Sequence, residues 1–255
     1  MKTFGNFPSG QPIQIVKKTD CIPNKKVFVL GVYASAVHAR WFCQNCKKPR
    51  IAVLAVASEP EIFWTGEGAD KIIADISPPN NTGCLEPAAE RFNGPSGRIL
   101  DKQILKPLGI LSRETTWLCD LVPYSCMNPG QKKALKREGL PIPDWPEVPD
   151  CLADDARQTE ILDELTASTA TILITLGDKP LQFFAAPRFG AKRRLADYGE
   201  DAEHYGQLHP FQLGDRKVQL LPLAHPRQIG RLGIHSEKWA ALHETWMTTT
   251  KPRII

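Results

Sequence analysis

The sequence lacks any apolar run of about eighteen residues, so no segment is long enough to span a bilayer as a helix. Its opening stretch, MKTFGNFPSGQPIQ, also lacks the continuous apolar core of a secretory signal. With 42% hydrophobic and 24% charged residues among 255, the composition is that of a folded globular protein. We therefore expect a soluble cytoplasmic protein with no membrane partner.

The chain also lacks a strong charge of either sign. Its formal net charge is +4, which permits a polyanionic partner without requiring one. Two basic clusters stand out, at 132–137 and 188–194. We interpret them as solvated faces, with contact to nucleic acid as the alternative.

Cysteine is too sparse for a disulfide-stapled scaffold. The seven cysteines are scattered, apart from Cys43 and Cys46. We expect reduced thiols and no bound metal. The spacing of Cys43 and Cys46 matches half of a zinc knuckle, so a zinc-binding interaction module stays open as a weaker hypothesis.

Apolar runs that end at glycine or a loop alternate with amphipathic segments along most of the chain. Residues 1–26 are polar and proline-dotted, and we expect them to form a peripheral segment of a single domain covering 1–255. Alternation of strands and helices predicts an α/β fold with three α/β/α layers and a mainly parallel sheet. The predicted strands are residues 27–31, 51–57, 116–122, 171–177 and 218–223, and the predicted helices include 97–108, 132–137, one opening at 154 and one starting at 236.

Four segments that follow predicted strands form a recognisable series. They are GVYASAVH at 31–38, RFNGPSGRIL at 91–100, LCDLVP at 118–123 and HPRQIGRL at 225–232. In this order they resemble the motifs of the uracil-DNA glycosylase superfamily, nearest to the branch with an apolar first motif and a His-Pro…Gly-Arg-Leu ending. The resemblance covers most of residues 27–247 and implies that superfamily's fold.

The resemblance implies roles for three side chains. Phe92 is expected to stack on a base taken out of the DNA helix, although a loop phenylalanine can equally be a core residue. His225 is expected to aim a hydrogen-bond donor at an oxygen of the departing base; the alternative is a structural His-Pro turn. Asp120 stands where the superfamily has a base-reading amide, which puts a preference for uracil in doubt because an ionised carboxylate only accepts.

The first motif lacks the carboxylate or amide that orients water in the commoner branches. Ser35, His38 and Tyr33 are the available substitutes, with His38 preferred for catalysis, and Gly31 and Tyr33 complete the expected base-binding set. Glu59 and Glu61 follow another strand end. We interpret these two glutamates as part of a solvated loop.

Contacts to DNA are expected at two further loops. The backbone amides of Gly94 and Gly97, near a helix start, suit phosphate groups. The segment after His225 combines cations with apolar side chains that can enter the base stack, namely Arg227, Ile229, Arg231 and Leu232.

Some members of the superfamily hold an iron–sulfur cluster on four cysteines. Cys126 and Cys151 fall near the positions of the later two, but the earlier pair has no counterpart. We therefore expect no cofactor.

The leading hypothesis is a monomeric DNA glycosylase that flips out a deaminated or damaged base, such as uracil, and hydrolyses its N-glycosidic bond in base excision repair. The alternative is a catalytically inactive or re-purposed nucleic-acid or nucleotide-binding protein of the same fold, which the apolar first motif and Asp120 favour.

Overall fold

The computed structural model describes residues 4–16, 24–232 and 236–252. The chain forms two compact units, each built from several separate segments. Unit 1 comprises Met1–Val16, Tyr33–Pro95 and Pro123–Asp150, and unit 2 comprises Lys17–Val32, Ser96–Val122 and Cys151–Ile255. The expectation of one domain over residues 1–255 stays a prediction.

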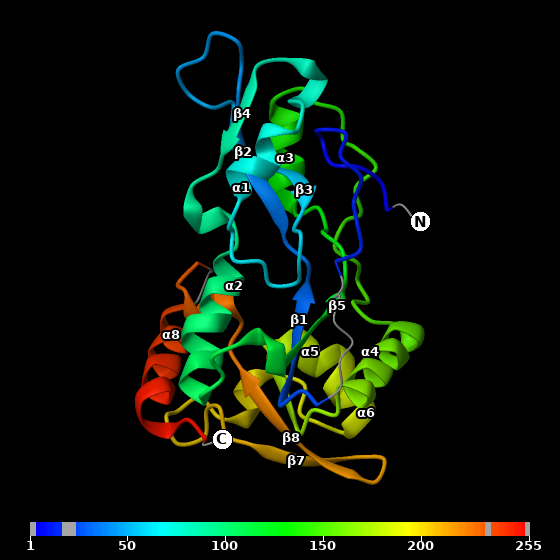
Figure 1. Ribbon diagram of the computed structural model, residues 1–255, viewed down its shortest axis with the longest axis vertical. Helices are drawn as coiled ribbons and strands as arrows, with labels where there is room; N and C mark the ends of the chain where they lie inside the picture. The colour runs from blue at the N-terminus through cyan, green and yellow to red at the C-terminus, as the bar shows by residue number, and fades with distance from the viewer. Residues whose placement is uncertain (1–3, 17–23, 233–235, 253–255) are drawn as a thin grey trace. The chain divides into compact units, whose positions relative to one another are not determined.

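Unit 2 is built on a five-stranded sheet with the strand order β5-β1-β6-β8-β7 (Figure 1). Strand β6 runs parallel to both β1 and β8, whereas β7 runs antiparallel to β8. Every residue of β5 and β6 is buried, as expected for sheet strands covered on both faces. The prediction of an α/β fold with a mainly parallel sheet is therefore confirmed. The strands are β1 (Val27–Tyr33), β5 (Thr116–Val122), β6 (Ile172–Leu176), β7 (His209–Leu213) and β8 (Arg216–Leu223).

Helices of unit 2 lie between these strands in the chain and after the last of them. The predicted helix at 97–108 is present as α2 (Pro95–Ile99), continued by a π-helical turn at Leu100–Leu105 and a 3-10 turn at Lys106–Leu108. The helix expected to open at 154 is present, and Asp154 is its N-cap, since its carboxylate accepts a hydrogen bond from the Arg157 amide at 2.8 Å. The others are α4 (Asp155–Ser168), α5 (Asp178–Pro180), α6 (Ala186–Phe189), α7 (Pro226–Ile229) and α8 (Ser236–Thr245).

Unit 1 contains a three-stranded antiparallel sheet with the order β3-β2-β4. Its strands are β2 (Ala36–Phe42), β3 (Ile51–Ser58) and β4 (Cys84–Pro87), and its helices are α1 (Ala69–Ala74) and α3 (Pro129–Arg137). Residues 31–38 were expected to follow a strand, but β1 continues to Tyr33 and β2 begins at Ala36, so most of this motif is itself strand. In β2, the buried residues Val37, Ala39 and Trp41 alternate with more exposed ones, which is the two-residue period of a strand.

The N-terminal segment contributes more than a peripheral cover. Phe7 and Ile13 are 1% and 2% exposed and belong to the hydrophobic core of unit 1, where the Phe7 ring lies 5.1 Å from that of Trp145. The polar and proline-rich composition of residues 1–26 hides these two apolar anchors.

The expectation of free thiols is wrong for Cys43 and Cys46, which form a disulfide. A turn after β2, in which the Cys46 amide donates to the Cys43 carbonyl, brings their Cα atoms within 5.2 Å. That separation lies within the range that a disulfide spans. Cys84, Cys119, Cys126 and Cys151 are free. In residues 4–16, 24–232 and 236–252, no group of three or more potential metal-ligating side chains comes together.

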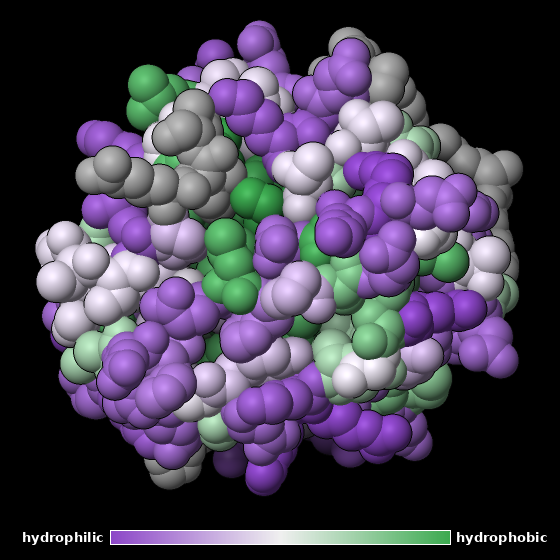
Figure 2. Space-filling view, turned by 90° about the horizontal axis from the view of Figure 1, so that it is seen from below, coloured by the Kyte–Doolittle hydropathy of each residue, from purple (hydrophilic) through white to green (hydrophobic). Residues whose placement is uncertain are grey.

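None of the helices in the described ranges is both long enough and apolar enough to span a membrane. The face of the molecule drawn in Figure 2 is covered mainly by hydrophilic residues, with hydrophobic ones in small groups between them.

Candidate functional site

The carboxyl ends of four strands of unit 2 lie along one edge of its sheet. Leu30 of β1 pairs with Thr175 of β6, which pairs with Pro222 of β8. Strand β5 starts level with β1, because the Lys26 amide donates to the Thr115 carbonyl at 2.8 Å. In open α/β sheets, ligands bind at this kind of edge.

Asp120 and His225 stand at this edge on strands that are not neighbours. Asp120 lies five residues beyond Thr115, and Gly31 lies five beyond Lys26, so the two are level on β5 and β1. His225 follows β8, and Gly177 follows β6. Three strand spacings therefore separate β5 from β8, roughly 14 Å. Of the two strands between them, β1 has Gly31 level with Asp120 and continues to Tyr33, and β6 ends at Leu176 and is followed by Gly177, so neither position contributes a side chain.

Asp120 is a buried carboxyl group, 4% exposed. Burial raises its pKa to about 7, against an opposing effect of the Arg157 guanidinium. Arg157 donates to the backbone carbonyl of Asp120 at 2.6 Å. Within the described part of the chain, no hydrogen bond reaches the Asp120 carboxyl oxygens. Protonated, this group offers one donor and one acceptor, as an amide does; ionised, it only accepts.

His225 is held in a single tautomer by the turn that follows β8. Its Nδ1 accepts a hydrogen bond from the Arg227 amide at 3.2 Å, and its own amide donates to the Gln228 side chain at 3.3 Å. An amide can only donate, so the imidazole proton resides on Nε2. Burial, with a smaller effect of the Arg227 charge, lowers the His225 pKa to about 4. The ring is therefore neutral at pH 7 and presents an N–H donor.

Gly177 fits this turn for a steric reason. Its φ is +83°, and a Cβ there would lie 3.2 Å from the Cβ of His225. The Gly177 amide also donates to the Leu223 carbonyl at 2.8 Å. The strand end and the His225 turn can approach this closely because residue 177 has no side chain.

A buried hydrogen-bonded chain supports the residue before His225. The Ala224 amide donates to the Tyr205 hydroxyl at 3.0 Å, and that hydroxyl contacts Nδ1 of His243 at 2.8 Å. Nε2 of His243 lies 2.9 Å from the Gln103 carbonyl, so it carries the proton. The Tyr205 hydroxyl therefore donates to Nδ1. Burial lowers the pKa of His243 to about 4, so this series of hydrogen-bonded side chains is uncharged at neutral pH.

We predict that Tyr205→Phe destabilises the protein by about 2 kcal/mol, because the buried Ala224 amide and His243 Nδ1 both lose their hydrogen-bond partner. Urea unfolding measures this loss. The matched control is Tyr198→Phe, which removes only the hydroxyl that accepts from the Lys192 amide at 3.0 Å. Equal losses of unfolding free energy in the two variants would show that the hydrogen bonds of Tyr205 contribute nothing special to stability.

In unit 1, His38 is fixed by the segment that carries Phe92. The Asn93 side chain accepts from the His38 amide at 2.7 Å and donates to the His38 carbonyl at 2.9 Å. Nδ1 of His38 lies 3.0 Å from the Phe92 carbonyl, so Nδ1 carries the proton. His38 thus has its acceptor nitrogen at Nε2. Asn93 is 3% exposed, and nothing in the sequence marked it as the residue that holds His38.

Phe92 itself is half-buried. The Arg91 guanidinium lies over its ring, 4.9 Å from the ring centroid. The ring is thus neither a fully buried core residue nor an uncovered platform. Phe92 belongs to unit 1, while Asp120 and His225 belong to unit 2.

Ser35 and Tyr33 flank the short connection between β1 and β2. The Ser35 amide donates to the Glu59 carboxylate at 3.0 Å. Glu59 is 6% exposed, so the expectation of a solvated loop is wrong for this residue. A buried carboxylate that binds a backbone amide is structural support for the connection. In the sequence, the only hint of this structural role was that Glu59 follows the end of a predicted strand.

Gly94 and Gly97 differ in their surroundings. Gly94 has a φ of +67°, and a Cβ there would lie 2.0 Å from the Thr65 backbone, so close packing within unit 1 requires glycine. Gly97 is buried in α2, and its carbonyl accepts from Arg113 at 3.4 Å. A role of their amides in phosphate binding stays a prediction.

Of the two arginines after His225, one is exposed and the other forms ion pairs within unit 2. Arg227 is exposed, whereas Arg231 pairs with Glu237 at 3.2 Å and Glu244 at 2.8 Å. Ile229 is 3% exposed, so in this conformation its side chain packs inside unit 2 rather than projecting as a wedge. Leu232 is half-buried.

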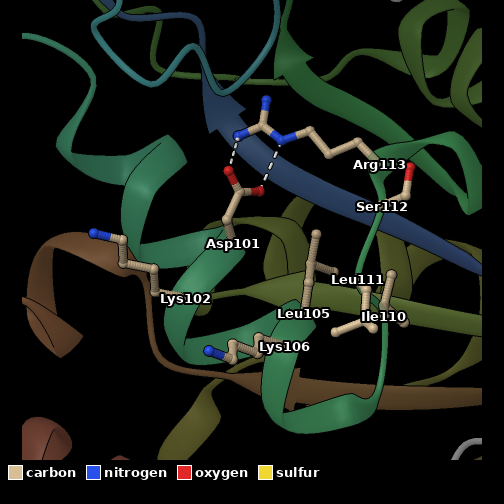
Figure 3. A pocket seen from close by; sticks show the side chains of 8 residues that line it. All are labelled: Asp101, Lys102, Leu105, Lys106, Ile110, Leu111, Ser112 and Arg113. Atoms are coloured by element: carbon tan, nitrogen blue, oxygen red, sulfur yellow. Dashed lines mark hydrogen bonds and ion pairs between the residues drawn. The ribbon is translucent and has the colours of Figure 1, made fainter.

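A pocket of unit 2 lies away from these residues, beside the loop that leads into β5 (Figure 3). Asp101 and Arg113 form a two-pronged ion pair across it, at 2.7 and 3.0 Å. It contains none of the predicted site residues, and its charged pair is already satisfied. Its lining is Asp101, Lys102, Leu105, Lys106, Ile110, Leu111, Ser112 and Arg113.

In comparisons with known proteins, no protein-family model matches the chain, and no curated protein matches it significantly. The likeness to the uracil-DNA glycosylase superfamily therefore rests on the four sequence segments.

Proposed function

We propose that this protein is a DNA glycosylase with a uracil-DNA-glycosylase-like fold, which removes a deaminated or damaged base by hydrolysis. The observation that carries the proposal is that two polar groups lie at the same sheet edge of unit 2. His225 offers a neutral imidazole donor, and Asp120 offers a buried carboxyl group without a hydrogen-bond partner among the described residues. The four motifs of the sequence support it.

Hydrolysis breaks the bond between the sugar C1′ and the base nitrogen. The electron pair of that bond leaves with the base, positive charge develops on the sugar, and water adds to C1′ with loss of a proton. A donor aimed at an oxygen of the leaving base stabilises the charge that develops there. Nε2–H of His225 supplies such a donor without itself needing to titrate at neutral pH.

Asp120 would read the edge of the base. A lactam edge, as in uracil, presents a carbonyl that accepts and a ring N–H that donates. A protonated Asp120 complements both, whereas the ionised form repels the carbonyl and suits an exocyclic amine instead. The site can therefore discriminate bases by the protonation state of one residue.

The second candidate function is binding of a nucleic acid or nucleotide without cleavage. The apolar first motif favours it, because residues 32–37 contain no carboxylate to orient water. A dissociative reaction needs little help for its nucleophile, so this absence alone does not decide between the two.

The test is release of base from labelled oligonucleotides that carry uracil, hypoxanthine, xanthine or an alkylated base, in single- and double-stranded form. Alkali-sensitive abasic sites from at least one of these strands support a glycosylase and identify its substrate. No release from any strand, together with measurable binding to the same strands, would replace the proposal with the binding-only function.

A further inference from the structure

A basic depression of about 800 Å³ lies in unit 2, beginning at the residue after Gly177. It is formed by the start of α5 and by the segment that follows α6. We call it the basic depression, and its lining is Asp178, Lys179, Gln182, Ala191, Lys192, Arg193, Arg194 and Asp197.

Both carboxylates of the basic depression are engaged within the protein. Asp178 accepts from the Leu195 amide at 2.7 Å, and Asp197 pairs with Arg194 at 2.9 Å. Lys179 and Arg193 are exposed, and no ion pair to either occurs in the described part of the chain; the Lys179 ammonium lies over the Phe183 ring, 5.7 Å from its centroid. The depression therefore has a net positive charge, with two cations available for an anionic ligand.

The lining also indicates which anion fits. It contains no aromatic ring on which a base could stack, so it offers contacts to phosphate groups rather than to bases. Its cations are spread over two segments rather than gathered around one point. This pattern is typical of a surface that follows a phosphodiester backbone.

We propose that the basic depression binds the backbone phosphates of the nucleic-acid strand whose base reaches Asp120 and His225. This inference rests on the proposed function. Its position supports it, since Asp178 directly follows Gly177, the residue whose Cβ position lies 3.2 Å from His225. One end of the basic depression is therefore adjacent in sequence to the glycine that packs against the His225 turn.

The test compares two double variants by fluorescence anisotropy, using an undamaged single-stranded oligonucleotide over a series of salt concentrations. Lys179→Gln with Arg193→Gln removes the two available cations. The control is Lys102→Gln with Lys106→Gln, which removes the same charge from two exposed lysines of unit 2 in the pocket of Figure 3. Inorganic triphosphate and a nucleoside triphosphate serve as competitors.

We expect the Lys179/Arg193 variant to bind about tenfold more weakly and to lower the slope of log K against log salt by about 1.4, the loss of two single-strand phosphate contacts. The control variant should keep the wild-type slope. The proposal is overturned by equal losses in both variants, by absence of wild-type binding, or by a nucleoside triphosphate that competes better than the strand.

Base release is measured separately on damaged strands. Loss of strand binding in the Lys179/Arg193 variant, without base release by the wild type, would retain this inference and reject the glycosylase. Base release by the wild type, with unchanged strand binding in the Lys179/Arg193 variant, would retain the glycosylase and reject this inference.

Discussion

His225→Ala is expected to reduce the single-turnover rate of base release by about 10²–10³-fold, the usual effect of removing one preorganised donor to a developing anion. The variant loses the Nε2–H donor that the Arg227 amide fixes by occupying Nδ1. Substrate binding should change much less, because the interaction strengthens as charge develops on the leaving base. Rates at saturating enzyme, with strand affinity measured in parallel, separate the two effects.

The matched control is His204→Ala. His204 belongs to the same unit but is exposed and pairs with Asp201 at 2.8 Å. Its removal should leave the rate unchanged. A His225→Ala variant that keeps more than about a third of the wild-type rate would remove His225 from the reaction, since a preorganised donor contributes far more than that.

Asp120→Asn is expected to change the pH dependence of uracil release. The wild-type rate should fall as pH rises through about 7, because the raised pKa of Asp120 keeps the donor form only below that pH. Above it, the protonated fraction falls about tenfold per pH unit. The asparagine variant keeps an uncharged donor and acceptor at all pH values, so its rate should stay flat and exceed the wild-type rate above pH 8.

A base with an exocyclic amine provides the internal control for this experiment. Its recognition should improve, not weaken, when wild-type Asp120 ionises. Parallel pH profiles for the wild type and the asparagine variant would show that Asp120 does not read the base.

The same substitution is expected to alter stability in a pH-dependent way. The folded-state pKa of Asp120 is raised to about 7 from 3.8, so the contribution of this one group to stability is most favourable below pH 4 and falls as pH rises toward 7. Asp120→Asn removes this loss. The gain in unfolding free energy should be small at pH 4 and reach up to about 4 kcal/mol above pH 7. Urea unfolding at several pH values measures it, and a constant gain would contradict the raised pKa.

The sequence predicted four of the five strands of unit 2, because their apolar runs are local signals, whereas β7 (His209–Leu213) was missed. The apolar runs at 116–122 and 171–177 end at positions that the structure reproduces within a residue. Since parallel strands end at a common edge, Asp120 and His225 could be assigned to one side of the sheet without coordinates.

Features that depend on the geometry of a turn or on residues farther along the chain were missed. The tautomer of His225 follows from the turn at Arg227, and the burial of Glu59 from the backbone of Ser35. Strand β2 does alternate in the sequence, but Ala36 and Ala39 weaken the hydrophobic signal that would mark it. The disulfide at Cys43 depended on a tight turn that the spacing alone left open.

The most direct test of the central claim is mass spectrometry of the products that the wild-type protein forms from a strand with one modified base. Hydrolysis of the N-glycosidic bond predicts equal amounts of free base and of an intact strand with an abasic site. The His225→Ala reaction should form both products about 10²–10³-fold more slowly. Unchanged substrate strands under conditions in which the protein binds them would contradict the claim.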